Sequence, residues 1–178
     1  MSGAWRWARR AVGRGGVAVL AGLLVGCSAG AAGDGSRDVS RSPGRQVPYW
    51  LDDVTPEAVA RQLNVRLPAS ATDARAAHQK GFQDDGLLLS FVLPAIEVDG
   101  FVARLAPERP LRARSRPVAG AVKPMTPFTR LGLPEPESIA DVREGQACAP
   151  CQGDVDSLNI AVVGVDGRTS RIYLRATD

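Results

Sequence analysis

Two cysteines three residues apart carry the most reactive side chains in the chain. Cys148 and Cys151 enclose an Ala-Pro dipeptide, and this spacing serves thiol–disulfide exchange, a structural disulfide or metal ligation. An exchange pair normally begins a helix, whose N-terminus stabilises the thiolate. Here the flanking residues are polar and typical of loops, and the nearby acids Glu144, Asp154 and Asp156 would disfavour a thiolate. Zinc needs four such ligands, and the chain adds one histidine, so we expect no metal site.

The single histidine, His78, is the candidate for a general base. Asp73, Asp84 and Asp85 follow or precede it closely, and a carboxylate can orient a histidine for proton transfer. A lone histidine on a polar strand is more commonly solvated, and we expect that outcome here. The chain has no H-E-x-x-H zinc motif. We therefore predict a protein that is not an enzyme and binds no cofactor.

A third cysteine, Cys27, closes the run Leu24-Val25-Gly26-Cys27 at the end of a short apolar segment. Residues 1–26 hold four arginines and no acid, which is the pattern of a secretory leader. The apolar stretch 15–26 is shorter than the roughly 20 residues that a membrane-spanning helix needs. The leader resembles that of a small secreted bacterial lipoprotein with a lipobox, of the high-GC Gram-positive type, with a domain of unknown function.

This resemblance implies a signal peptide over residues 1–26 and a lipid on Cys27. Stable anchoring takes about two acyl chains, which a lipidated Cys27 would carry at the extracytoplasmic face of the cell membrane. Ordinary secretion after Ala29-Gly30-Ala31 and an uncleaved anchor are the alternatives. Because export leads to an oxidising compartment and Cys27 is used for lipid, Cys148 and Cys151 are predicted to form a disulfide.

The charge of the chain changes when the leader is removed. The formal net charge of the whole sequence is +3, from 22 basic and 19 acidic residues. Without the four leader arginines, 18 basic residues face 19 acids, a net charge of about −1. This balance gives no reason to expect nucleic-acid binding.

Basic residues nevertheless gather in one segment, which contains no acid between residues 109 and 130. We interpret this segment either as a solvated loop or as an arm that contacts anionic lipid headgroups or wall polymers. The residues predicted to make such contacts are Arg109, Arg112, Arg114, Arg116 and Lys123.

The pattern of apolar residues predicts how these side chains are positioned. Residues 27–46 are small and polar and indicate a flexible linker, and residues 47–178 a single domain. Helices are expected over 56–64 and 95–106, and strands over 87–93, 158–165 and 169–177. Residues 72–80 are expected to form a polar strand, although their alanine-rich part would also suit a helix. The last two strands flank Asp166-Gly167, a hairpin signal. A long Pro- and Arg-rich loop is expected at about 107–137.

These elements predict an α+β fold. We expect a small antiparallel sheet of about four strands, two helices packed on one face, and a C-terminal β-hairpin. The function that follows is a membrane-anchored extracytoplasmic lipoprotein acting as a non-catalytic binding or interaction module of the cell envelope. Its partners would be the membrane through Cys27, and an anionic lipid, a wall polymer or an envelope protein. The alternatives are thiol–disulfide exchange through Cys148 and Cys151, and a structural envelope spacer.

Overall fold

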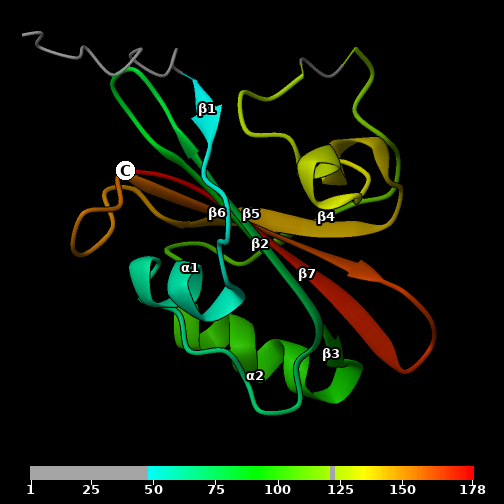
Figure 1. Cartoon of the computed structure of the whole chain (residues 1–178). Helices are drawn as coiled ribbons and strands as arrows, with labels where there is room; N and C mark the ends of the chain where they lie inside the picture. The colour runs from blue at the N-terminus through cyan, green and yellow to red at the C-terminus, as the bar shows by residue number, and fades with distance from the viewer. Residues whose placement is uncertain (1–47, 121–122) are drawn as a thin grey trace, which may run out of the picture. The chain divides into compact units, whose positions relative to one another are not determined.

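The structure, a computed structural model that describes residues 48–120 and 123–178, consists of one antiparallel sheet and two helices (Figure 1). The strands are β1 (Tyr49–Trp50), β2 (Thr72–Lys80), β3 (Gly86–Pro94), β4 (Arg112–Arg114), β5 (Val142–Cys148), β6 (Ser157–Gly164) and β7 (Thr169–Thr177). The helices are α1 (Pro56–Gln62) and α2 (Ala95–Leu105), and two 3-10 turns are η1 (Phe128–Leu131) and η2 (Pro136–Ser138). The predicted leader 1–26, Cys27 and the linker 27–46 lie outside the described residues.

The prediction of an α+β fold with about four strands is wrong. Within the described residues the sheet has seven strands, in the order β1-β2-β3-β7-β6-β5-β4, and the chain is mostly β-structure. The four expected strands are present as β2, β3, β6 and β7, and β6 and β7 form the expected hairpin. The strands that the prediction missed are β1, β4 and β5, which extend the sheet on both sides.

Both helices pack on one face of the sheet, which we call the helix face (Figure 1). Alternate residues of β3, from Leu87 to Leu93, are fully buried there, as the period-2 pattern predicts. Val98, Phe101 and Val102 of α2 cover them, and the ring of Phe101 meets that of Phe91 edge-on at 5.2 Å. Burial of these apolar side chains is the main stabilisation of this layer.

Helix α1 begins where its sequence predicts. The side chain of Thr55 accepts a hydrogen bond from the backbone N–H of Ala58 at 3.2 Å, and Pro56 occupies the first turn, where no N–H is required. Val59, Ala60 and Leu63 are buried against the sheet. The cap therefore fixes the start of the helix, and its apolar face fixes its position.

The opposite face, which we call the loop face, is covered by the segment expected to be a long loop. Within residues 107–137 the structure places β4, η1 and η2. Phe128 and Leu133 form a second core on this face with Leu88 and Tyr173, and the rings of Phe128 and Tyr173 meet edge-on at 4.9 Å. The described residues of 107–137, which we call the covering segment, therefore form the layer that covers this face of the sheet.

Gly86 allows this layer to approach the sheet closely. A Cβ atom at residue 86 would lie 1.8 Å from the methyl group of Thr126, which is itself buried. A residue with a side chain would push the covering segment away from β3.

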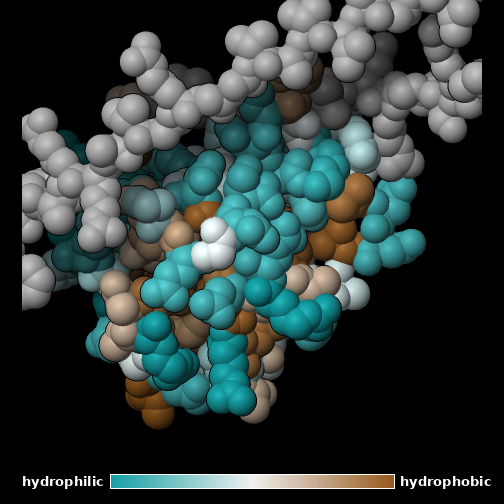
Figure 2. Space-filling model, turned by 90° about the vertical axis from the view of Figure 1, so that its left-hand side faces the viewer, coloured by the Kyte–Doolittle hydropathy of each residue, from teal (hydrophilic) through white to brown (hydrophobic). Residues whose placement is uncertain are grey.

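The side of the molecule seen in Figure 2 is largely hydrophilic, with small hydrophobic groups between polar residues. Within residues 48–120 and 123–178, no helix is long and apolar enough to span a bilayer.

Candidate functional site

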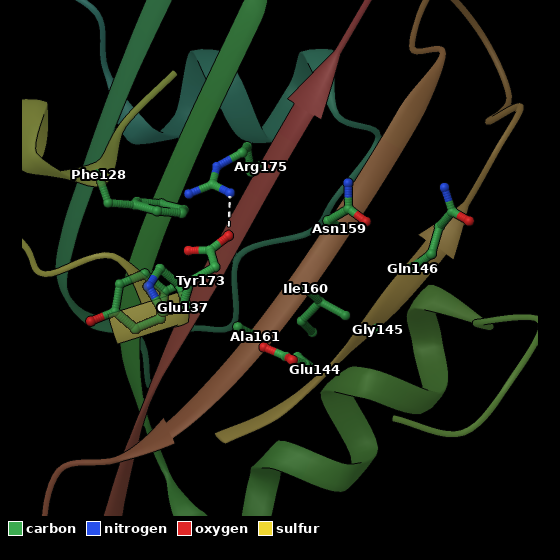
Figure 3. A pocket seen from close by; sticks show the side chains of 11 residues that line it. Phe128, Glu137, Glu144, Gly145, Gln146, Asn159, Ile160, Ala161, Tyr173 and Arg175 are labelled. Carbon is green, nitrogen blue, oxygen red and sulfur yellow. Dashed lines mark hydrogen bonds and ion pairs between the residues drawn. The ribbon is translucent and has the colours of Figure 1, made fainter. Parts of the chain in front are cut away.

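A cavity of about 400 Å³ lies on the loop face, over β5, β6 and β7. We call it the sheet-face cavity (Figure 3). Phe128 and Tyr173 give it an apolar wall, and the small side chain of Ala161 leaves space within it. Its polar lining residues are Glu137, Glu144, Gln146, Asn159 and Arg175.

The register of the sheet brings the polar lining residues together. Gln146 of β5 lies opposite Asn159 of β6, and Asn159 lies opposite Arg175 of β7. Residues directly opposite one another across adjacent strands point to the same face. Three consecutive strands therefore place an amide, an amide and a guanidinium in one row.

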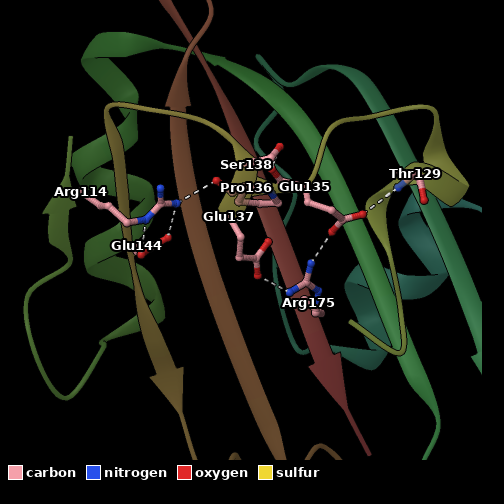
Figure 4. A network of polar contacts seen from close by, with 8 residues as sticks. All are labelled: Arg114, Thr129, Glu135, Pro136, Glu137, Ser138, Glu144 and Arg175. Atoms are coloured by element: carbon pink, nitrogen blue, oxygen red, sulfur yellow. Dashed lines mark hydrogen bonds and ion pairs between the residues drawn. The ribbon is translucent and has the colours of Figure 1, made fainter. Parts of the chain in front are cut away.

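Arg175 is held by two carboxylates from the covering segment (Figure 4). Its Nη1 donates to Oε1 of Glu137 at 2.7 Å, and its Nη2 donates to Oε2 of Glu135 at 2.7 Å. The guanidinium also lies over the ring of Phe128, 5.0 Å from its centre. These contacts tie η2 to the centre of the sheet.

The Glu137–Arg175 pair keeps hydrogen-bonding capacity at the cavity wall. Oε2 of Glu137 and Nε of Arg175 are buried and have no hydrogen-bond partner among the described residues. Burial raises the pKa of Glu137, but the hydrogen bond from Arg175, a backbone hydrogen bond and the charges of Arg175 and Arg114 together outweigh it, so that pKa lies below its ordinary value. Glu137 is therefore ionised at neutral pH, with one oxygen atom that a small side-chain movement could offer to a donor.

Arg114 is a second anchor, and it uses all five of its N–H groups inside the protein. Its Nε and Nη2 donate to the two carboxylate oxygens of Glu144 at 2.8 and 3.0 Å (Figure 4). Its remaining hydrogen bonds go to backbone oxygens, from Nη1 to Arg116 and Ile139 and from Nη2 to Pro136, at 2.7–2.8 Å. The side chain fastens the covering segment to β5.

The residues predicted to contact an anionic surface therefore differ in whether their side chains are available to an external anion. Arg114 has no N–H left for an external anion. Arg109 and Arg112 are exposed beside a second cavity, of about 450 Å³, which we call the edge cavity. Arg116 and Lys123 are also exposed, and Lys123 lines a hollow with Trp50.

The edge cavity adjoins the sheet-face cavity along β5. Glu144, Gly145 and Gln146 line both. The other side of the edge cavity is formed by the segment 108–112, which leads into β4, and by Cys148. The two cavities therefore meet at the same three residues of the strand.

The predicted disulfide is confirmed: Cys148 and Cys151 are joined in the structure. Cys148 ends β5, Cys151 lies in the loop that leads to β6, and both are partly buried against the core of the helix face. The residues between Cys151 and Ser157 form no helix, so the helix N-terminus that activates an exchange pair is not found at this site.

His78 is buried, and the expectation of a solvated histidine is wrong. Its Nε2 lies 2.9 Å from Oδ2 of Asp85, and Lys80 forms an ion pair with the same oxygen. The backbone N–H of Gly81 donates to the other oxygen of Asp85, at 3.2 Å, so the turn between β2 and β3 folds around this carboxylate. The backbone groups of Asp85 and Asp178 also exchange two hydrogen bonds, each at 3.2 Å. The contacts of this cluster close the turn between β2 and β3.

Asp85 makes a testable contribution to stability in acid. Burial raises its pKa, but hydrogen bonds from Lys80, His78 and Gly81 outweigh it, so the pKa lies below its ordinary value. A depressed pKa stabilises the fold above the unfolded-state value of about 3.9, and the contribution is lost as pH falls through the folded-state pKa. We expect Asp85→Asn to unfold at lower urea concentration at pH 7, with a smaller further loss below pH 4 than the parent chain. An equal further loss of stability below pH 4 in the variant and the parent chain would contradict this.

Comparison with protein families, with curated proteins and with solved structures finds no match for this chain. Among the described residues, no group of three or more His, Cys, Asp or Glu side chains is arranged to hold a metal ion. The site must therefore be interpreted from its own geometry.

Proposed function

We propose that this chain is a lipid-anchored extracytoplasmic protein whose folded region binds a small polar ligand in the sheet-face cavity. The leader and Cys27 motif support the location, and the cavity supports the activity. Its volume of about 400 Å³ is within the range of roughly 300–1,000 Å³ that is usual for small-molecule sites. A structural spacer would have no need of such a cavity.

The row of side chains from Gln146 to Arg175 is the observation that carries this proposal. The amides of Gln146 and Asn159 each offer donors and an acceptor, and both residues are exposed at the cavity. Glu137 adds an ionised acceptor beside the apolar wall of Phe128 and Tyr173. This combination suits a ligand with hydroxyl or amide groups, such as a saccharide or a short peptide of the envelope.

The test is a titration of the full chain with neutral disaccharides and with N-acetylated, C-amidated di- and tripeptides, followed by calorimetry. Replacement of Asn159 by alanine removes a hydrogen-bonding side chain from the cavity, and one such bond contributes about 1 kcal/mol. We therefore expect Asn159→Ala to weaken binding about fivefold.

Gln152→Ala is the matched control, because Gln152 is an exposed amide residue outside this cavity. It should leave affinity unchanged. Failure of every probe to bind, or equal weakening by the two variants, would overturn the proposed site.

The location is tested independently through Cys27. We expect Cys27→Ala to remove the attachment point for lipid, so that the protein is released or remains as an unprocessed precursor. Cell fractionation and the mass of the product distinguish these states from the anchored form. A Cys27→Ala chain that still fractionates with membrane at the size of the processed protein would contradict the anchor.

A further inference from the structure

We propose that the ligand of the sheet-face cavity also carries an anionic group, a carboxylate or a phosphate, and that Arg109 and Arg112 bind this group in the edge cavity. The inference rests on the proposed function, because it treats the two cavities as parts of one binding site.

The first observation is that the side chains of Arg109 and Arg112 form no hydrogen bond or ion pair among the described residues, although those of five other arginines do. Arginines that bond a carboxylate within the described chain are Arg75, Arg114, Arg143, Arg171 and Arg175. The guanidinium groups of Arg109 and Arg112 are thus free to bind an external acid, and the planar fork of arginine matches a carboxylate or phosphate with two parallel hydrogen bonds.

The second observation concerns the acids of the edge cavity, which do not neutralise the pair. Glu144 lines the cavity, but Arg114 occupies both of its carboxylate oxygens. Glu108 is the remaining acid in the lining, and it is exposed. Two free arginines against one free glutamate leave a positive charge at the cavity, which favours an anionic group.

The third observation is the position of the arginine pair relative to the sheet-face cavity. The pairing of β4 with β5 ends at Glu144. Beyond that point, β5 lies beside the segment that leads into β4, and it has no paired strand on that side. At Gly145 a Cβ atom would lie 3.0 Å from a methyl group of Leu111. The lack of a side chain at Gly145 thus lets Leu111 approach β5, which holds Arg109 and Arg112 beside the wall shared by the two cavities.

The geometry therefore divides one ligand into two parts. A neutral polar part lies over Gln146 and Asn159, and an anionic end lies across Gly145 at the arginine pair. Carboxylate and phosphate groups satisfy the same fork geometry, so a free acidic metabolite, an acidic glycan, a peptide carboxyl terminus and a lipid headgroup share the required chemistry.

Pairs of probes that differ only in the anionic group test this inference on the full chain. We would compare glucose with glucose 6-phosphate, and an N-acetylated tripeptide amide with the same tripeptide as the free acid. We expect the anionic member of at least one pair to bind about tenfold more tightly at low salt, with this advantage declining as salt screens the charges.

Arg109→Gln with Arg112→Gln should abolish the tenfold difference while leaving the affinity of the neutral probe unchanged. Arg116→Gln is the matched control, because Arg116 is an exposed arginine of the same segment that lines neither cavity. It should preserve the difference. Nanodiscs of anionic or neutral lipid identify the source of the anionic group. If the anionic discs alone protect Arg109 and Arg112 from an arginine-modifying reagent, the group belongs to a lipid headgroup.

The possible failures are distinguishable. Neutral probes that bind through Asn159, with no advantage for their anionic counterparts, would overturn the anionic subsite and leave the proposed function standing. An anionic advantage that depends on Arg109 and Arg112 but not on Asn159 would support the subsite and overturn the proposed site on the loop face. An equal effect of Arg116→Gln would reduce the arginine pair to general charge attraction and would overturn the inference.

Discussion

Replacement of Arg114 by alanine is expected to lower the free energy of unfolding by about 3 kcal/mol. The change removes two hydrogen bonds to Glu144 and three to backbone oxygens of the covering segment. It also leaves Glu144 without its counter-ion; because that side chain is partly exposed, we place the loss at the lower end of the roughly 3–5 kcal/mol for buried pairs. Urea unfolding of the full chain, followed by circular dichroism, measures the effect.

Arg116→Ala provides the comparison for this prediction. Arg116 lies two residues further along and is exposed, so its loss should change stability by less than about 0.5 kcal/mol. Equal effects of the two substitutions would show that Arg114 is an ordinary surface arginine and that it does not fasten the covering segment to β5.

Arg175→Met should destabilise the protein by a similar amount, about 3 kcal/mol, for a different reason. Methionine keeps much of the apolar contact with Phe128, but it leaves Glu135 and Glu137 with no shared guanidinium between them. Two carboxylates that lose the same cation repel each other, and each loses a charge-assisted hydrogen bond. Thermal and urea unfolding at pH 7 measure the loss.

The origin of that loss can be isolated by removing the acids as well. Adding Glu135→Gln and Glu137→Gln to Arg175→Met should recover at least half of the lost stability, since no uncompensated charge then remains. A triple variant as unstable as Arg175→Met alone would assign the effect to packing against Phe128 rather than to charge.

The sequence predicted the centre of the sheet well, because the residues there are buried on a regular period. Leu87, Phe91, Ile160 and Ile172 belong to strands whose alternate residues face the helices, and all four are buried. The cap at Thr55 and the Asp166-Gly167 turn use short-range chemistry that is visible in a few residues.

The outer strands were missed for physical reasons. Within β5 only Val142 and Ala147 are buried, and a register shift between Gln146 and Cys148 breaks the alternation. β1 and β4 are two and three residues long, so they have too few residues to show a period. Their partners are also distant in sequence, since β1 pairs with the end of β2 beyond α1 and β4 pairs with β5 beyond η1 and η2.

The candidate site was missed although part of its signal was present. If Ile160 and Ile172 face the helices, then Asn159, Tyr173 and Arg175 must face the other way. Polar residues on a face that the fold covers indicate a site rather than a solvated surface. What the sequence did not show was the partner of each charge: Arg114 looked like one of several free arginines, and only the fold pairs it with Glu144.

The position of β7 has a consequence for the order in which this protein can fold. β7 is the last described strand along the chain, yet it is the strand that joins β3 on one side to β6 on the other. Until it is in place, β1–β3 and β4–β6 are separate groups, and β3 and β6 each have an edge of unpaired backbone N–H and C=O groups. A chain emerging N-terminus first therefore completes its sheet only after β7 has emerged. Such late closure exposes the incomplete sheet to aggregation if the emergence of β7 is delayed.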